Sequence, residues 1–273
     1  IICFIHPFVY LYRQKQLNHT VSCFIYMKIK EYSMRLTYIY HSGFAIETEG
    51  YTILIDYFKD TGKTPDTGFV HDELLQRAGT LYILSSHFHP DHFNPDVLKW
   101  KEIKSDIKYI FSKDILKRHR ATAEDAVYLK KGDVFEDENI RIRAFGSTDV
   151  GISFLIEAEG KLLFHAGDLN NWHWKDESTP QEVAKAEGDY LRELDILAQA
   201  TGHLHLAMFP VDPRIGTDFM RGAEQFVDRI KTDVLVPMHF WEHPAEVVAF
   251  GPYAESKGCR YILLSYPGES TDF

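Results

Sequence analysis

Residues Ser85–His92 read SSHFHPDH and directly follow the apolar run Leu81–Leu84. In an extended backbone, residues two positions apart point to the same side, and Pro90 fixes a turn near the end of the stretch. These constraints bring together four side chains that can bind a metal, His87, His89, Asp91 and His92. Imidazole and carboxylate ligands suit zinc, iron or manganese. A lone His-x-His is explained by a polar surface loop, but this longer pattern after a buried strand predicts a metal centre.

The remainder of the chain from Met34 onward predicts an α/β fold. Short apolar or alternating runs predict strands, and apolar residues at helical spacing predict helices. The expected strands are 36–40, 44–48, 51–57, 81–84, 108–111, 140–145, 152–157, 161–165, 204–209, 234–237 and 261–264, and the expected helices are 66–78, 95–100, 179–200, 218–231 and 244–256. Glu159-Gly160 is a typical hairpin turn, and Thr179 with Glu182 predicts a capping box. Two mixed β-sheets packed face to face, with helices on the outer faces, would bury the apolar sides of these elements in an αββα sandwich.

The composition of the chain excludes several classes of protein. With 273 residues, of which 45% are hydrophobic, one large domain with a sizeable core is expected. The formal net charge of −10 argues against a protein that grips nucleic acid by its phosphates. The three cysteines show no Cys-x-x-Cys spacing, which favours a reducing cytoplasm over a disulfide framework. Because no apolar run approaches the ~20 residues that cross a bilayer, no membrane partner is expected.

The pattern His-x-His-x-Asp-His at a strand end resembles the signature of the metallo-β-lactamase superfamily. In that family a later strand ends in Gly-Asp, whose carboxylate bridges two metals, and Leu162–Asp168 matches this feature. The family's last metal-binding histidine follows a late apolar strand, and Val234–His239 has that form. The resemblance covers most of Met34–Leu264. It implies one or two divalent metal ions, Zn or Mn, held by His87, His89, Asp91, His92, Asp168 and His239.

Within the superfamily the chain is most similar to the group that includes the cytoplasmic lactonase of ascorbate 6-phosphate. The segments that resemble this group are Tyr40–Gly43, Ile55-Asp56, Phe209–Arg214 and Pro237–His239. The resemblance implies hydrolysis of a small, anionic metabolite, such as a lactone or a phosphoester, by water that the metal activates. Asp91 is expected to orient that water.

The chain departs from the family at the third histidine of the first metal site. That histidine normally follows a strand such as Ile140–Phe145. If the family pattern is aligned without gaps from this strand to Asp168, Ser147 occupies the position of the histidine. A serine hydroxyl is a poor ligand beside imidazole. The vacant coordination position is therefore left to a water or to one of three protein candidates, His41, Asp149 and His165.

Other histidines have competing explanations. For His41 and His165, a hydrogen-bonded structural role is as well supported as a role in the site. For His173 the structural role is favoured. The second His-x-His, at 203–205, begins a strand and lacks the following Asp-His. We therefore do not assign it to the metal centre.

Three large side chains are candidates for substrate contacts. Arg214 could hold a phosphate or carboxylate by its two-pronged geometry, although a salt bridge with a neighbouring acid is an equal alternative. Trp172 and Trp241 could wall a pocket, but aromatic residues near loops more often simply pack.

Three functions fit these observations. The favoured one is a metal-dependent hydrolase that acts on a small molecule. A nuclease of the same superfamily is disfavoured, because the chain is acidic and the stretch between His92 and Asp168 is too short for the extra domain of many such enzymes. The third is a non-catalytic metal-binding or regulatory module that has lost activity through the change at Ser147. The sequence leaves the oligomeric state open.

Residues 1–33 differ from the expected hydrolase domain, residues 34–273. The apolar segment Ile1–Tyr12 has neither the preceding basic segment nor the following cleavage site of a secretory signal. Residue 1 is not Met, whereas Met34 opens the first well-patterned strand, and Lys30-Glu31 can be encoded by a purine run of the ribosome-binding type. We expect an N-terminal extension of translated, non-native leader; the alternative is a native element that packs on the domain.

If residues 1–33 are leader, a chain that begins at Met34 will fold with an unchanged melting temperature. Thermal unfolding of the shortened and full-length chains, followed by circular dichroism, tests this. A melting temperature lowered by many degrees would show that the extension packs on the domain.

Overall fold

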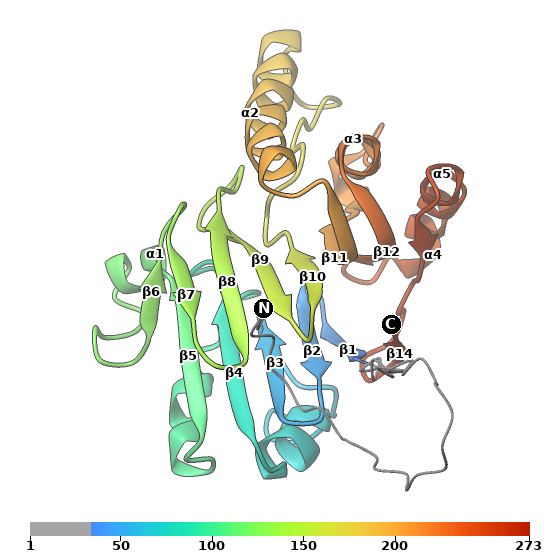
Figure 1. Cartoon of the computed structure of the whole chain (residues 1–273). Helices are drawn as coiled ribbons and strands as arrows, with labels where there is room; N and C mark the ends of the chain where they lie inside the picture. The colour runs from blue at the N-terminus through green and yellow to red at the C-terminus, as the bar shows by residue number, and fades with distance from the viewer. Residues whose placement is uncertain (1–33) are drawn as a thin grey trace, which may run out of the picture. The chain divides into compact units, whose positions relative to one another are not determined.

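Two mixed β-sheets of seven strands each form the centre of the computed structural model, which describes residues 34–273 (Figure 1). The first sheet has the order β14-β1-β2-β3-β4-β5-β6, and the second has the order β13-β12-β11-β10-β9-β8-β7. The strands of the first sheet are β1 (Arg35–Tyr40), β2 (Gly43–Glu47), β3 (Tyr51–Ile55), β4 (Thr80–Ser85), β5 (Ile107–Ser112), β6 (Val127–Leu129) and β14 (Ser270–Asp272). Those of the second are β7 (Val134–Glu136), β8 (Ile140–Phe145), β9 (Ser153–Ala158), β10 (Lys161–His165), β11 (His203–Pro210), β12 (Lys231–Met238) and β13 (Arg260–Tyr261). The expected leader, residues 1–33, lies outside the described residues.

Helices connect the parallel strands. The α-helices are α1 (Lys113–Lys117), α2 (Pro180–Ala200), α3 (Arg221–Arg229), α4 (Pro244–Val247) and α5 (Gly251–Ser256). Shorter 3₁₀ or π turns cover Phe69–Glu73, Leu74–Gln76, Pro95–Glu102, Pro213–Ile215 and Val248–Phe250. Over residues 34–273, no helix is long and apolar enough to cross a membrane.

Each sheet begins as an antiparallel meander and continues with parallel strands. In the first sheet β1, β2 and β3 are antiparallel, and β3 to β6 are parallel. In the second, β8, β9 and β10 are antiparallel, and β10 to β13 are parallel. The turn at Glu159-Gly160 joins β9 to β10 with positive φ at both residues, as the hairpin expectation requires. The expected order of meander and α/β units is thus confirmed in both halves.

The side chains of one strand alternate between two hydrophobic clusters. Ile53 and Ile55 of β3 belong to the larger cluster, which includes residues of both sheets and of α2 and α3. Leu54, between them, belongs to a second cluster with Val97 and Trp100 of the short helix before β5. Because successive strand residues point to opposite faces, one face of the first sheet packs against the second sheet and the other is covered by helical turns.

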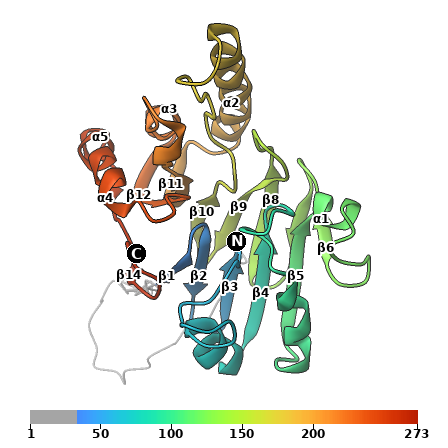
Figure 2. The same cartoon turned by 180° about the vertical axis from the view of Figure 1, so that it is seen from behind.

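The second sheet carries its helices on the opposite side, as the views from front and back show (Figures 1 and 2). Phe226 of α3 packs against Phe164 of β10 and Phe209 of β11, with ring centroids 5.7 and 4.6 Å apart. Thr179 and Glu182 form the expected capping box at the start of α2. The αββα sandwich is therefore confirmed.

Several expected elements are shorter or differ in type. The expected helix 66–78 is a π turn followed by a 3₁₀ turn, and the expected helix 244–256 is divided into α4, a 3₁₀ turn and α5. Pro252 lies in the first turn of α5, where its missing N–H breaks the continuity of the hydrogen-bond ladder. The expected strand 261–264 is reduced to the two residues of β13. The short elements α1, β6, β7 and β14 were not expected.

Candidate metal centre

Five strands that point in the same direction within their sheets bring candidate ligands to one end of the sandwich. The segment after β4 carries the His-x-His-x-Asp-His stretch, and the segments after β1, β8, β10 and β12 carry His41, Asp149, Asp168 and His239. The common direction follows from the pairing of the strands. Residues far apart in sequence are thus placed in one cluster.

A first group of side chains could hold one metal ion. It consists of His87, His89, Asp149 and Asp168, whose ligand atoms all lie within 4.8 Å of one another. His87 Nε2 lies 3.1 Å from His89 Nδ1 and 3.4 Å from Asp168 Oδ2. Ligands held about 2.0–2.2 Å from a tetrahedral ion are roughly 3.3–3.6 Å apart, so the separation from Asp168 suits a metal and the two imidazoles lie slightly closer than that.

A second group could hold another ion. Its members are His41, Asp91, His92 and His239, again with ligand atoms within 4.8 Å of one another. Asp91 Oδ2 lies 3.3 Å from His41 Nε2 and 3.8 Å from His92 Nε2. His41, which we considered for the first site, is thus grouped with the second.

The Asp168 carboxylate lies between the two groups. Its Oδ2 faces His87 Nε2 of the first group, whereas its Oδ1 lies 3.2 Å from His92 Nε2 and 3.5 Å from His239 Nε2 of the second. One oxygen is therefore available to each group, which is the arrangement that a bridging carboxylate requires.

Buried polar atoms without hydrogen-bond partners test whether these residues fit metal ions. Both ring nitrogens of His41, Nε2 of His92 and Oδ1 of Asp168 are inaccessible to solvent and make no aligned hydrogen bond. Such atoms are costly unless something binds them. Bound divalent metals would satisfy them, so the donor set fits a two-metal centre.

The electrostatics of the cluster favour the metal-binding forms of several ligands. Burial and the neighbouring His92 lower the pKa of His87 to about 3, and burial and His239 lower that of His41 to about 3. Burial opposes ionisation of Asp168, but His92 and His239 outweigh it and hold its pKa well below its usual range. These imidazoles are neutral and this carboxylate is charged at neutral pH, as coordination requires.

Two buried carboxylates orient the histidine ligands. Asp56 accepts hydrogen bonds from the Ser86 amide at 2.7 Å and from its hydroxyl at 2.6 Å, and its Oδ2 lies 2.7 Å from His92 Nδ1. Asp212 Oδ2 lies 2.8 Å from His239 Nδ1. Each contact directs the Nε2 atom of the imidazole toward the cluster, as carboxylates do around metal sites. The sequence motifs do not single out either aspartate for this role, but the position of both at strand ends is the signal for it.

Other sequence candidates are occupied by structural contacts. His165 has its Nε2 2.8 Å from the Ser42 carbonyl oxygen, and its Nδ1 accepts from the Gly167 amide, so it has no free ligand atom. His173 makes comparable backbone contacts through both nitrogens. The His-x-His at 203–205 lies at the start of β11, at the opposite end of the sheet from the cluster.

The three large candidates lie beside His41 and His239. Trp172 packs edge-on against the ring of His239 with centroids 5.3 Å apart, and the ring of Trp241 lies tilted against that of His41 with centroids 4.2 Å apart. Arg214 donates to both oxygens of Asp212 and lies over Trp241. A hollow of about 240 Å³ adjoins this group and is lined by Thr148, Trp172, Glu182, Lys185, Ala186 and Asp189.

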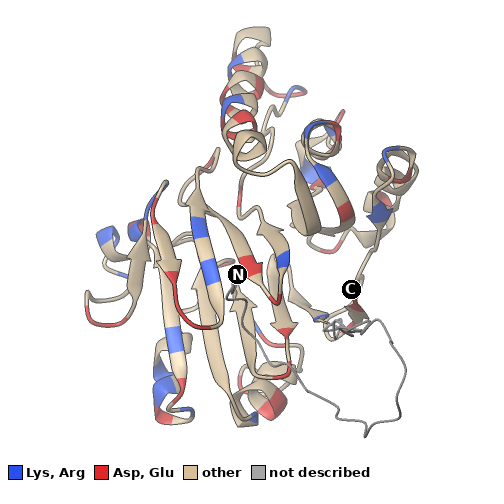
Figure 3. Cartoon of the chain, in the orientation of Figure 1, with Lys and Arg blue, Asp and Glu red and all other residues tan. Residues whose placement is uncertain are grey.

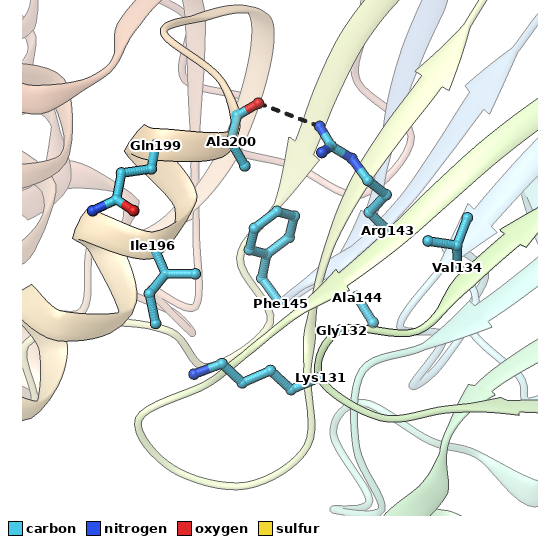
Figure 4. A pocket seen from close by; sticks show the side chains of 9 residues that line it. All are labelled: Lys131, Gly132, Val134, Arg143, Ala144, Phe145, Ile196, Gln199 and Ala200. Carbon is cyan, nitrogen blue, oxygen red and sulfur yellow. Dashed lines mark hydrogen bonds between the residues drawn. The ribbon is translucent and has the colours of Figure 1, made fainter.

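A larger hollow lies away from the ligands. It has a volume of about 380 Å³ and lies between α2 and the strand β8, with Phe145 and Ile196 on its walls (Figure 4). Arg143 donates a hydrogen bond across it to the Ala200 carbonyl. No ligand candidate lines this hollow.

A sequence profile of the Beta-lactamase superfamily domain matches residues 35–239, which include every ligand candidate described above. The chain belongs to the metallo-β-lactamase superfamily. A UPF0173 metal-dependent hydrolase of Symbiobacterium thermophilum is 25% identical over 248 residues, which are 87% of this chain and 99% of that protein.

Solved structures of the superfamily fold superpose over most of the chain. A metallo hydrolase from the archaeon Ignicoccus hospitalis has a TM-score of 0.64 at 21% identity and covers 88% of this chain and 98% of its own. An isothiocyanate hydrolase from Delia radicum gut bacteria has a TM-score of 0.51 at 15% identity, covering 88% and 99%. CmlA of Streptomyces venezuelae, a diiron β-hydroxylase, has a TM-score of 0.61 at 16% identity, covering 88% and 54%. Together with the ligand groups, superfamily membership identifies the chain as a metal-dependent hydrolase.

Replacing Asp56 with Asn will weaken metal binding about 10–100-fold, the usual effect of losing an outer carboxylate. The side-chain amide of the variant has one acceptor oxygen and cannot accept all three hydrogen bonds that Asp56 receives from Ser86 and His92. The ring of His92 is then no longer fixed. Metal affinity measured by competition with a chromogenic chelator tests this, with the exposed Glu138→Gln as the control. Unchanged affinity in Asp56→Asn would contradict the orienting role.

Proposed function

We propose that this protein hydrolyses a small, anionic metabolite, a lactone or a phosphoester, by means of two divalent metal ions. The observation that carries the proposal is the pair of ligand groups that share Asp168. His87 and His89 belong to one metal, and Asp91, His92 and His239 belong to the other. Zinc and manganese are the metals we propose, and a cytoplasmic enzyme is the setting that the cysteine content favours.

The chemistry is divided between the metals and the protein. Two bound metals would lower the pKa of water from about 15.7 to about 7 and polarise a carbonyl or phosphoryl oxygen. The nearby histidines hold the pKa of Asp91 below its usual range despite its partial burial. Asp91 is therefore a carboxylate that can accept a hydrogen bond from the attacking water. Asp56 and Asp212 keep the imidazoles in place during turnover.

The surroundings of the cluster support an anionic substrate. The Arg214 side chain is 43% exposed, and its Nε and one terminal nitrogen are engaged by Asp212. Within residues 34–273, the other terminal nitrogen makes no hydrogen bond and can bind a carboxylate or phosphate. Trp241 offers a flat apolar surface against the guanidinium, and Trp172 offers another against His239. The hollow next to Trp172 gives room for a small molecule. The resemblance to the ascorbate 6-phosphate lactonase group favours the same substrate class.

A nuclease is less well supported. On α2, acidic residues outnumber basic ones (Figure 3), and Lys185 and Arg192 both pair with Asp189. Cations that are already paired contribute little to the binding of a polyanionic backbone. A metal-binding module without catalysis would bind metal but turn over no substrate. Screening the metal-loaded protein on lactones and phosphoesters therefore tests this alternative as well.

Asp168→Asn and His239→Ala will each lower both metal content and hydrolysis, because a shared carboxylate or a closing imidazole is lost. Metal content is measured by plasma mass spectrometry, and hydrolysis is measured on panels of lactones and phosphoesters with the zinc- and manganese-loaded protein. Full metal occupancy in both variants would contradict the ligand assignment. Two metals bound to the parent protein with no turnover on either panel would contradict the proposed substrate class.

Arg214→Gln will raise KM for an anionic substrate about tenfold or more and leave KM for a neutral ester or lactone nearly unchanged. The expected loss corresponds to one charge-assisted contact, about 1.5–3 kcal/mol. Steady-state kinetics on matched charged and neutral substrates provide the measurement. Equal losses on both would mean that Arg214 acts only by holding Asp212.

A further inference from the structure

The loop Gly146–Gly151, which we call the Asp149 loop, joins β8 to β9 beside the first ligand group. The gap-free register placed Ser147 at the position of the family's third histidine. In the structure the Ser147 hydroxyl instead accepts a 3.3 Å hydrogen bond from the Asp149 amide, within the loop. Asp149, two residues later, belongs to the first ligand group.

Hydrogen bonds fix the middle of this loop to the segment that carries Asp168. The Thr148 hydroxyl donates to the Asn170 carbonyl at 2.6 Å and accepts from the Asn170 amide at 3.0 Å. Thr148 is therefore tied to the backbone two residues after the shared carboxylate. A loop held in this way presents its next residue, Asp149, to the cluster with little freedom.

The end of the loop is held against the His-x-His strand. The amide of Ile152 donates to the Ser86 carbonyl at 3.0 Å. Gly151 has φ +79°, and a Cβ there would lie 2.1 Å from the Ser86 carbonyl oxygen and 2.5 Å from the His87 Cβ. Only glycine permits this approach, which positions the loop directly beside the first metal-binding histidine.

The position of the Asp149 carboxylate suits coordination. Its Oδ2 lies 3.6 Å from His89 Nδ1, a separation that fits two ligands of one ion. The side chain is 47% exposed, so the carboxylate can move the few tenths of an ångström that coordination requires. Over residues 34–273, the Asp149 carboxylate makes no ion pair with Lys or Arg that would compete for it.

We propose that Asp149 replaces the third imidazole of the first metal site, and that this site consequently discriminates less strongly against manganese in favour of zinc than the second site does. The inference rests on the two-metal centre of the proposed function. The first group offers two imidazoles and two carboxylates, whereas the second offers three imidazoles with Asp91 and the shared Asp168. Imidazole suits zinc, and carboxylate oxygen suits manganese. The two sites of one centre therefore differ in metal preference.

Metal competition tests the assignment without relying on activity. The full-length protein is stripped with a chelator and equilibrated with Zn²⁺ and Mn²⁺ whose free concentrations are buffered over a series of Mn:Zn ratios, and both bound metals are then counted by plasma mass spectrometry. Electron paramagnetic resonance reports the coordination of bound Mn²⁺. The parent protein, Asp149→Asn and Asp149→His are compared. Glu138→Gln is the matched control, because it removes a 72% exposed carboxylate at the other end of β8.

The parent and the control are expected to bind two equivalents of metal, and manganese will replace zinc in the first site at a lower Mn:Zn ratio than in the second. Asp149→Asn will lose the equivalent that exchanges at the lower ratio and keep the other, and Asp149→His will raise the Mn:Zn ratio needed for exchange at the first site tenfold or more. Two retained equivalents in Asp149→Asn would overturn the ligand assignment. Exchange of both sites of the parent at one and the same Mn:Zn ratio would overturn the difference in metal preference. A parent with the expected metals but no hydrolysis would overturn the proposed function and leave this inference standing.

Discussion

The sharing of one carboxylate between two sets of imidazoles is the constraint on which the rest of the structure depends. Asp168 is almost fully buried, and its two oxygens face His87 on one side and His92 and His239 on the other. A buried carboxylate is tolerated only when charges or donors surround it. The two sheets must therefore be packed so that strand ends from both meet around this one side chain.

The outer carboxylates extend this constraint into the sandwich. Asp56 links the end of β3 to the segment after β4, and Asp212 links the segment after β11 to that after β12. Each holds one imidazole in the orientation that exposes Nε2 to the cluster. His41 and His239 also have positive φ, a conformation that costs energy in residues other than glycine. The packing of both sheets thus holds in place candidate ligands whose positions the local sequence alone would not determine.

Local patterns allowed much of this arrangement to be predicted. The His-x-His-x-Asp-His stretch lies on one strand end, so spacing alone groups its members, and the alternation of apolar residues predicts the long strands and both meanders. The grouping of His41 with the second set and of Asp149 with the first could not be derived from spacing, because it depends on how β1 and the loop after β8 approach β4. The short strands β7 and β14 have too few residues for an alternating pattern. Pro252 interrupts a stretch whose apolar spacing otherwise predicts one helix.

The pairing of β14 with β1 has a consequence for synthesis on the ribosome. Leu36 of β1 lies opposite Thr271, so the outer edge of one of the first strands to emerge stays unpaired until translation has passed the last described residues. An unpaired strand edge is a template for pairing with another chain. This edge of the growing polypeptide therefore stays open to such pairing even after most of both sheets has been made, and chaperones that shield nascent chains would have to cover it until β14 is in place.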